Sequence, residues 1–326
     1  MTPSARPSRS KRPPPKAWVP SAAAKESLCG PSPSWPVPRP RGPRPSGAAR
    51  RRDGGPPPPR PRRSPDSPGR RPLPRHEGDT LGGTHVAGRH AVRELLSTGG
   101  REVKEILVAE HLGASDVVDE ILELARRGSV PVRETNRAAL GRLAGLDVHQ
   151  GVLAIAEPLR ARELDDLAKP GDGGPATLVA LDGVTDPHNV GAVLRSAESA
   201  GATGGVLARH GGPPVTATVA KAAAGAIEHL PLASVARIPA ALERLRASGL
   251  WIVGLDADGD SPLFGLELLT EPVVLVLGAE GAGLSRLSRE RCDVVASIPR
   301  KGQTASLNVS AAAALACYEV LRVRGD

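Results

Sequence analysis

The stretch that decides the fold runs from Ile298 to Arg322 and reads IPRKGQTASLNVSAAAALACYEVLR. It begins like the end of a strand and finishes as an apolar helix, with a polar elbow between the two. Capping the helix needs one side chain that accepts its first free backbone N–H groups, and either Ser306 or Asn308 suffices. The elbow holds more polar residues than capping needs, and this surplus indicates a ligand-binding corner.

Upstream of the elbow, from Thr177 onward, apolar strands alternate with helices. Such alternation predicts βαβ units and a parallel sheet covered by helices on both faces, with ligands bound at the carboxyl ends of the strands. Three polar segments fall at those ends, and they follow the apolar strands near residues 178–184, 272–278 and 294–298. The predicted helices span 189–201, 216–227, 239–249 and 284–292, and the last begins at Ser306.

A smaller unit precedes this alternation. The spacing of Val117, Ile121, Leu124 and Ala125 predicts an amphipathic helix, and further helices and strands surround it. Residues 84–158 therefore form a small α/β domain. The composition of residues 159–176 is typical of a linker.

The charge of the chain is distributed unevenly. The 326 residues carry a net charge of +8, but residues 1–80 hold 18 of the 43 Lys and Arg and only 5 of the 35 Asp and Glu. Proline-rich runs such as RPSRSKRPPPK cannot bury enough apolar surface to offset the entropy of ordering, so we expect a disordered basic tail. The tail is either an arm that attracts RNA phosphates, or an unselected extension, or a transit peptide.

The composition also limits the cellular setting. No run of eighteen apolar residues could span a bilayer, so we expect no membrane association. The three cysteines, Cys29, Cys292 and Cys317, have no metal-ligand spacing, and their odd number fits no disulfide framework. We therefore expect a cytoplasmic protein without a bound metal.

The glycine-rich segment GAEGAG, residues 278–283, is a weak signal on its own. Its glycines do not match G-x-G-x-x-G, and the chain contains no Walker A signature, which disfavours dinucleotide binding and nucleotide hydrolysis. Tight turning before a helix would explain the glycines. It would not explain Glu280, a carboxylate placed inside a glycine turn after a fully apolar strand.

Two polar residues follow Pro187 and also have ordinary explanations. Asn189 is suited to cap the helix that begins here. Arg195 lies six positions further along, which is not a helical repeat, so the two side chains need not share a face. Arg195 is either a solvated surface residue or a long side chain that reaches back toward the start of the helix.

Three motifs in order give a specific resemblance. The segments LDGVTDPHNVGAVLRSAESAGA (181–202), LVLGAEGAGLS (275–285) and SIPRKGQTASLNVSAAAALACYE (297–319) resemble the motifs of the SpoU-type (TrmH family) RNA 2′-O-ribose methyltransferases of the SPOUT superfamily. GRHAVRELL (88–96) and HQGVLA (149–154) resemble the substrate-binding domain of the subgroup that methylates a guanosine of 23S ribosomal RNA.

The resemblance implies a particular α/β fold. A trefoil-knotted, parallel-sheet methyltransferase domain, residues 177–326, would follow a small α/β substrate-binding domain similar to ribosomal protein L30e. Knots are nearly absent among protein folds, so only the resemblance implies this one. The implied cofactor is S-adenosylmethionine, held by backbone groups near Gly278, Ile298 and Leu307.

The family's functional positions correspond to Asn189, Arg195, Glu280, Ser306 and Asn308. The family pattern suggests Arg195 as general base, but a guanidinium titrates above about 12 and has no acceptor. We therefore expect Arg195 to orient the ribose or stabilise its developing alkoxide, while a phosphate oxygen or water accepts the proton. Glu280 would orient Arg195, and Ser306 and Asn308 would position the nucleotide.

One departure from the family pattern concerns RNA contacts. A methionine commonly follows the Ile-Pro of the third motif, whereas this chain has Arg300 and Lys301, which either contact the RNA backbone or serve surface solubility. Residues 81–326 contain only three aromatic residues, Trp251, Phe264 and Tyr318. We therefore do not expect stacking of bases on aromatic side chains to be the main mode of RNA binding.

The expected partners are 23S ribosomal RNA, free or in a precursor of the large subunit, and a second copy of the chain in a homodimer. Two other RNA substrates stay open: a transfer RNA guanosine and an rRNA adenosine whose methylation confers antibiotic resistance. A different class of function, a non-catalytic RNA-binding or ribosome-assembly factor, also stays open. The five intact family positions favour an enzyme.

Overall fold

The computed structural model describes residues 80–113, 115–145, 149–169, 174–210, 212, 214–303 and 306–325. The tail predicted over residues 1–80 lies outside the described residues, apart from Thr80, which begins the first strand. In the described part, no helix combines the length and the apolar character needed to cross a bilayer.

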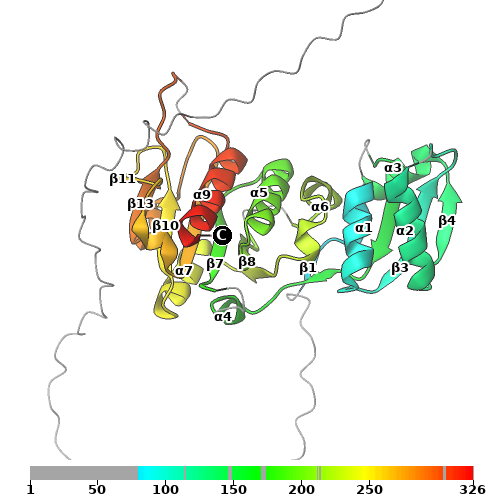
Figure 1. Ribbon diagram of the computed structural model, residues 1–326, viewed down its shortest axis with the longest axis horizontal. Coiled ribbons are helices and arrows are strands. Elements are labelled where there is room, and N and C mark those ends of the chain that lie inside the picture. The colour runs from blue at the N-terminus through cyan, green and yellow to red at the C-terminus, as the bar shows by residue number, and fades with distance from the viewer. Residues whose placement is uncertain are drawn as a thin grey trace, which may run out of the picture. The chain divides into compact units, whose positions relative to one another are not determined.

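A seven-stranded sheet forms the C-terminal part of the described chain (Figure 1). Its strand order is β11-β13-β10-β12-β7-β8-β9, and every neighbouring pair is parallel, which confirms the predicted parallel sheet. The trefoil knot stays a prediction. The strands span β7 Thr177–Asp182, β8 Gly204–Ala208, β9 Leu232–Val235, β10 Trp251–Leu255, β11 Ser261–Pro262, β12 Val273–Gly278 and β13 Val294–Ser297.

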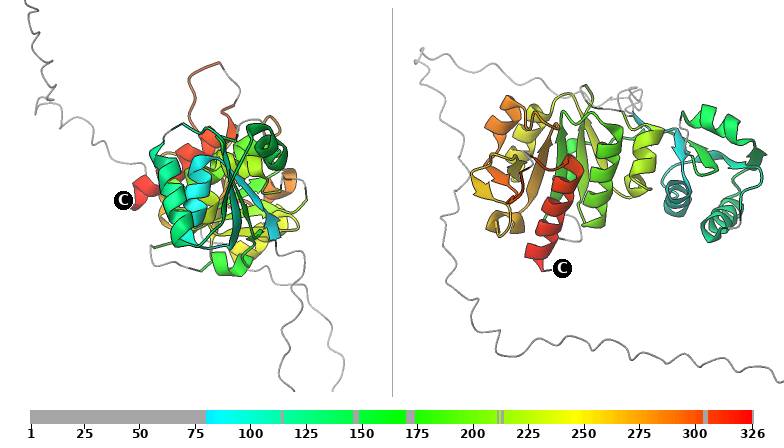
Figure 2. Two further views of the ribbon diagram at one scale, coloured as in Figure 1. Left: turned by 90° about the vertical axis from the view of Figure 1, so that its right-hand side faces the viewer. Right: turned by 90° about the horizontal axis from the view of Figure 1, so that it is seen from above.

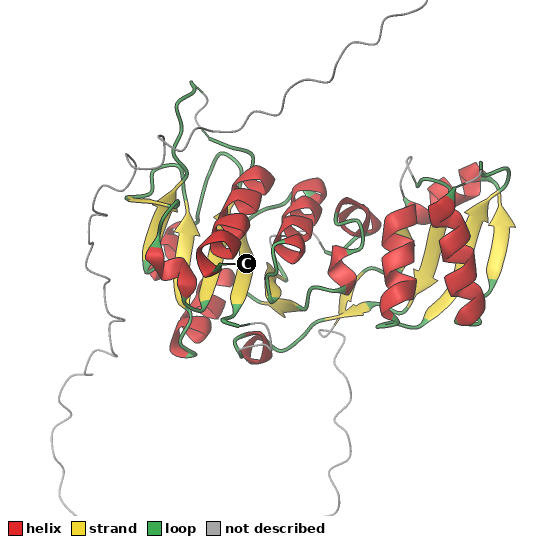
Figure 3. Ribbon diagram, in the orientation of Figure 1, coloured by secondary structure: helices red, strands yellow, loops and turns green. Residues whose placement is uncertain are grey.

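Both faces of this sheet are apolar and covered by helices (Figure 3). Along β12, Leu275 and Leu277 face one cluster of buried residues, while Val274 and Val276 face the other, as the two-residue period of a strand requires. The first face is covered by α5 Pro187–Ser199, α6 Ala217–Ala222 and α9 Val309–Arg324, and the second by α4 Leu164–Leu167, α7 Ile238–Ala247 and α8 Arg286–Arg291.

Close backbone approach brings α5 against its neighbours on the first face. Figure 2 shows α5 and α9 side by side along the sheet. On the other side of α5, a Cβ at Gly191 would lie 2.4 Å from Cβ of Ala222 and 2.7 Å from the carbonyl oxygen of Val219. Only glycine therefore allows α6 to pack this closely against the start of α5, near the polar segment that follows β7.

The smaller unit contains a four-stranded sheet of order β2-β5-β3-β4, in which only the β3–β4 pair is parallel. The helix predicted from the spacing of Val117 and Ile121 forms as α2. The similarity to ribosomal protein L30e stays a prediction. The elements span β2 His85–Ala87, α1 Arg89–Thr98, β3 Val103–Ala109, α2 Asp116–Arg127, β4 Val132–Thr135, α3 Arg137–Ala144 and β5 Val152–Ala156.

The segment predicted as a linker, residues 159–176, contains regular structure. Its strand β6 Leu159–Arg160 pairs with β1 Thr80–Gly82, and its short helix α4 buries Leu164 and Leu167. Two leucines one turn apart are enough to anchor such a helix in the core, although the surrounding composition is polar. The assignment of residues 159–176 as a linker stays a prediction, and its first half contains these two short elements.

The helix predicted over residues 216–227 is interrupted. It ends at Ala222, and Ala224 and Gly225 adopt left-handed backbone conformations, with φ of 51° and 97°, before the 3-10 helix η3 Ala226–Glu228. The strand β9, the short strand β11 and the 3-10 helix η4 Glu267–Thr270 were not predicted. All of these are short elements, for which periodicity gives little signal.

Candidate functional site

The predicted polar segments after β7 and β12 meet at the carboxyl edge of the large sheet. The two strands are adjacent, and Gly278 at the end of β12 pairs in register with Asp182 at the end of β7. The Oδ2 of Asp182 also accepts a hydrogen bond from the backbone N–H of Ser285 at 2.9 Å, which ties the glycine-rich segment to the neighbouring strand.

Asn189 lies inside α5 and does not cap it. The cap is Asp186, whose Oδ1 accepts a hydrogen bond from the backbone N–H of His188 at 3.0 Å, and Pro187 is the first residue of the helix. The suggested capping role of Asn189 is therefore wrong. Its side chain is buried, with 8% exposed, and its Nδ2 donates to Oε1 of Glu280 at 2.8 Å.

Asn308 combines a capping role with a second set of contacts. Its Oδ1 accepts from the backbone N–H of Ser310 at 2.8 Å, which makes it the N-cap of α9. Its Nδ2 donates to Oε1 of Glu280 at 2.7 Å and to Oδ1 of Asn189 at 3.1 Å. Asn308 of the polar elbow thus joins one carboxylate and one amide from the other two polar segments, in what we call the Asn–Glu–Asn cluster: Asn189, Glu280 and Asn308.

Arg195 is exposed on α5 and takes no part in this cluster. Within the described part of the chain it forms no hydrogen bond and no ion pair. The expected contact in which Glu280 orients Arg195 is therefore not formed, because both hydrogen bonds of Glu280 come from amides. Arg195 is left facing solvent.

The glycine-rich segment forms a tight turn that presents Glu280. The backbone N–H groups of Ala279 and Gly283 each donate to the carbonyl of the other, at 3.0 and 2.9 Å. A Cβ at Gly278 would lie 2.1 Å from the carbonyl carbon of Gly283, so no larger residue fits there. Gly281 has a φ of 76°. The predicted tight turn is present, and it leaves Glu280 exposed.

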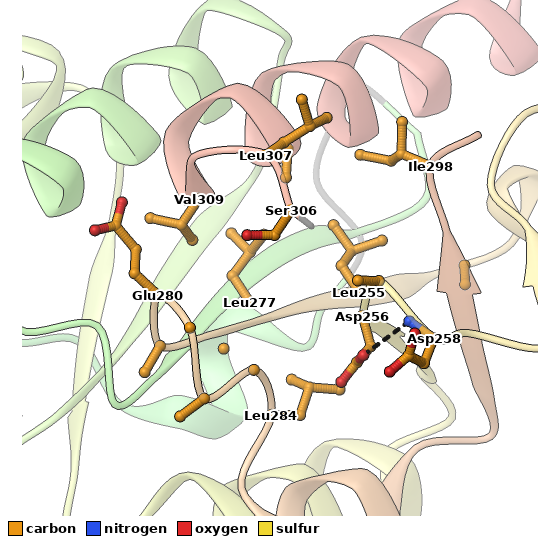
Figure 4. Close-up of a pocket in the computed structure, with 18 of the residues that line it drawn as sticks. Leu255, Asp256, Asp258, Leu277, Glu280, Leu284, Ile298, Ser306, Leu307 and Val309 are labelled. Carbon is orange, nitrogen blue, oxygen red and sulfur yellow. Dashed lines mark hydrogen bonds between the residues drawn. The ribbon is translucent and has the colours of Figure 1, made fainter. Parts of the chain in front are cut away.

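A cavity of about 590 Å³ lies beside the Asn–Glu–Asn cluster. Figure 4 shows Glu280 at one end of this cavity and Asp256 and Asp258 at the other. Five predicted site residues line it, whereas Asn189, Arg195 and Asn308 do not. The lining includes Gly278, Glu280, Ile298, Ser306 and Leu307, together with the apolar side chains of Leu255, Leu277, Leu284 and Val309.

The far end of the cavity holds charged residues that the sequence reasoning missed. Asp256 forms an ion pair with Arg289 at 2.7 Å and accepts from the backbone N–H of Asp258 at 3.0 Å. Arg289 also donates to the carbonyl oxygen of Asp258 at 3.1 Å. Asp256 directly follows the apolar strand β10, so the rule that ligands lie at the carboxyl ends of parallel strands could have found it.

Arg300 and Lys301, the two cations that depart from the family pattern, are both exposed. Arg300 lines the cavity near Asp258, and its Nη2 donates to the carbonyl oxygen of Ala257 at 3.3 Å. Contact of these two side chains with an RNA backbone stays a prediction.

Comparison with known proteins finds a family match for each of the two parts of the described chain. Residues 176–318 match the SpoU rRNA Methylase family, and residues 85–162 match the family described as RNA 2′-O ribose methyltransferase substrate binding. A 23S rRNA (guanosine-2′-O-)-methyltransferase RlmB from Pseudomonas aeruginosa is 42% identical over 243 residues, which is 73% of this chain and 96% of the relative. The chain belongs to the SpoU rRNA methylase family.

Other relatives agree with this assignment. A putative TrmH family tRNA/rRNA methyltransferase from Staphylococcus aureus is 37% identical over 74% of this chain and 97% of its own length. Among solved structures, the SpoU methyltransferase AviRb from Streptomyces viridochromogenes in complex with AdoMet is 29% identical. It superimposes with a TM-score of 0.60 over 74% of this chain and 89% of that chain.

Proposed function

We propose that this SpoU family member transfers a methyl group from S-adenosylmethionine to the ribose 2′-hydroxyl of a guanosine in 23S ribosomal RNA. The observation that carries the proposal is the Asn–Glu–Asn cluster at one end of the cavity, built from all three polar segments of the large sheet. The 42% identity to a 23S rRNA guanosine methyltransferase supports this choice of substrate.

The cavity fits the proposed cofactor. S-adenosylmethionine supplies an electrophilic methyl group on a positively charged sulfonium and carries a flat adenine. The apolar side chains of Ile298, Leu307 and Val309 suit the adenine, and carboxylates at both ends of the cavity suit the positive charge. Gly278 allows close backbone approach because a Cβ there would overlap Gly283.

The residues at the Glu280 end would then handle the ribose. A 2′-hydroxyl is a weak nucleophile, so its proton must be removed and its developing charge stabilised as it reacts. Arg195, exposed and without a partner in the described chain, is available to orient the ribose or a neighbouring phosphate. Ser306 lines the cavity beside Leu307 and would contact the nucleotide.

A homodimer and a cytoplasmic location complete the proposal. The helix α9 exposes Leu315 and Tyr318, with 40% and 49% of each residue accessible, and Leu307 just before it is 40% exposed. Exposed apolar side chains on one helix are suited to contact a second copy of the chain. A monomeric mass in light scattering at micromolar concentration would contradict the dimer.

The experiment that tests the function is a map of ribose methylation. Total RNA from cells with and without the gene would be compared position by position, and the purified protein would then be given 23S rRNA, transfer RNA and S-adenosylmethionine. We expect one guanosine of 23S rRNA to lose its methyl group in the deletion strain and to regain it in vitro. Methylation of a transfer RNA or of an adenosine would replace the substrate, and no methylation of any RNA would leave a binding or assembly role.

A further inference from the structure

Glu280 has two carboxylate oxygens in different situations. Its Oε1 accepts two hydrogen bonds, from Nδ2 of Asn189 at 2.8 Å and from Nδ2 of Asn308 at 2.7 Å. Its Oε2 has no hydrogen-bond partner among the described residues, and the side chain is exposed at the end of the cavity (Figure 4). One oxygen is therefore fixed in place while the other is open to a ligand.

The orientation of the Asn308 amide, one of the two that hold Glu280, is set by Ser310. The Oδ1 of Asn308 accepts from both the backbone N–H of Ser310, at 2.8 Å, and its hydroxyl, at 2.5 Å. Turning the Asn308 amide over would point its NH₂ at the backbone N–H of Ser310, which can only donate, and its oxygen at the carboxylate of Glu280. The amide is thus held with its NH₂ toward Glu280, and Ser310 fixes the geometry of the carboxylate through Asn308.

We propose that Oε2 of Glu280 accepts the proton of the ribose 2′-hydroxyl, and that Ser310 acts as a positioning residue for it. The inference rests on the proposed function. A carboxylate has lone pairs that can take a proton, whereas a guanidinium such as that of Arg195 has only donors. Glu280 lines the cavity and Arg195 does not.

The proton transfer balances without any further reactant. As the bond from the ribose oxygen to the methyl carbon forms, the carbon–sulfur bond of the cofactor breaks and its electron pair neutralises the sulfonium. The O–H bond of the 2′-hydroxyl breaks, and its proton forms a new O–H bond at Oε2 of Glu280. Water then removes this proton after the methylated RNA leaves, because the carboxyl group is exposed.

The sharpest test is Glu280→Gln. Glutamine has the same shape, and its side-chain oxygen can accept from both amides, so it retains the cluster while replacing the open oxygen with NH₂, which cannot take a proton. We expect the variant to bind S-adenosylhomocysteine, by titration calorimetry, and the rRNA fragment, by fluorescence anisotropy, within threefold of the wild type. Its single-turnover methylation rate should fall at least about 100-fold, as expected for loss of a general base.

Two further measurements separate a base from a structural residue. The acid limb of the pH–rate profile, which reports protonation of the base, should be present in the wild type and absent from the residual activity of Glu280→Gln. Ser310→Ala should lower the rate about tenfold with both binding constants unchanged, and Ser310→Thr, which restores a hydroxyl, should recover most of it. No recovery by threonine together with weakened binding would assign Ser310 a purely structural role.

The outcomes distinguish this inference from the proposed function. If the wild type methylates no guanosine of 23S rRNA, the proposed function fails before any variant is made. If the wild type is active and Glu280→Gln retains a rate within threefold, or loses cofactor binding, Glu280 is not the proton acceptor and the inference fails alone.

Discussion

Asn189 and Asn308 stand 119 positions apart in the sequence, and Nδ2 of Asn308 donates to Oδ1 of Asn189 across 3.1 Å. The first side chain comes from α5 and the second caps α9, so the contact requires both helices to begin at neighbouring points of the same sheet edge. Glu280, on the segment between them, accepts from both amides. Asn308 therefore both caps α9 and holds Glu280 in place at the site.

The two roles of Asn308 can be separated by substitution. Asn308→Ala removes the cap and the amide, and we expect it to lower the free energy of unfolding by about 1 kcal/mol. Asn308→Ser retains a capping oxygen but has no NH₂ for Glu280, so its stability should stay within about 0.5 kcal/mol of the wild type. Urea denaturation measures these differences.

Both Asn308 variants should lose methylation activity to a similar extent, since both lack the amide that fixes Glu280. Single-turnover rates with an rRNA fragment check this. A serine variant as active as the wild type would show that the cap, and not the amide, is what the reaction needs.

The second prediction concerns Gly278, where the neighbouring backbone leaves no space for a Cβ. A Cβ at this position would lie 2.1 Å from the carbonyl carbon of Gly283 and 2.4 Å from the backbone nitrogen of Leu284, which cannot move aside like a side chain. Gly278→Ala should therefore cost about 2–3 kcal/mol of unfolding free energy and weaken binding of S-adenosylhomocysteine. The matched control is Gly100→Ala, because the nearest atom to a Cβ at Gly100 is 4.0 Å away.

Thermal denaturation and titration calorimetry measure both effects. Normal cofactor binding by a stable Gly278→Ala protein would mean that the glycine-rich segment does not shape the cofactor site.

The sequence indicates the parallel sheet and its three polar segments because both depend on patterns local to each element. Apolar runs of five to seven residues between helices predict buried strands, and the order of the strands in the sheet then decides which segments meet. The contact of Asn189 with Glu280 depends on β7 lying beside β12, which no local pattern states. The family resemblance supplied that grouping.

The wrong capping role of Asn189 and the missed Asp256–Arg289 ion pair also have physical reasons. Asn189 suits a capping position by residue type, but Asp186 and Pro187 start the helix three residues earlier and leave Asn189 buried. The Asp256–Arg289 ion pair joins a loop after β10 to α8, so the two residues have no common periodicity. Long-range polar contacts such as these are fixed by tertiary packing, and a single sequence carries no direct signal for them.

The cysteines give a prediction about chemical reactivity. Burial raises the pKa of the Cys292 thiol to about 12, and nearby Asp293 adds to the shift, while burial alone raises the pKa of the Cys317 thiol to about 12. A raised thiol pKa keeps the neutral, unreactive form dominant at pH 8, where an ordinary thiol with a pKa near 8.5 is partly ionised. Iodoacetamide at pH 8 should therefore leave both residues unmodified in the folded protein.

Peptide mass spectrometry checks this expectation after labelling with and without roughly 6 M guanidinium chloride. That concentration unfolds even very stable domains. Unfolding should make both cysteines reactive, since the shift comes from burial. Rapid labelling of Cys292 in the folded state would show that the turn linking α8 to β13 opens readily.

The last prediction tests whether Arg195 acts as a positively charged hydrogen-bond donor or as the proton acceptor. If its planar guanidinium orients the ribose or a phosphate, lysine cannot reproduce the two parallel hydrogen bonds, so Arg195→Lys and Arg195→Ala should lose activity to similar extents. Affinity for S-adenosylhomocysteine should stay nearly unchanged, because Arg195 does not line the cavity. Arg237→Ala, an exposed arginine at the start of α7 on the opposite face of the sheet, is the matched control and should retain its activity.

The pH dependence of the two Arg195 variants decides the assignment. With Glu280 as proton acceptor, the residual activity of both variants should retain the acid limb of the wild-type profile, because the titrating carboxylate is still present. Single-turnover methylation of an rRNA fragment at a series of pH values measures this. A lysine variant with substantial activity and a new titration near neutrality would show instead that position 195 takes the proton, since lysine lowers its pKa in a buried site more readily than arginine.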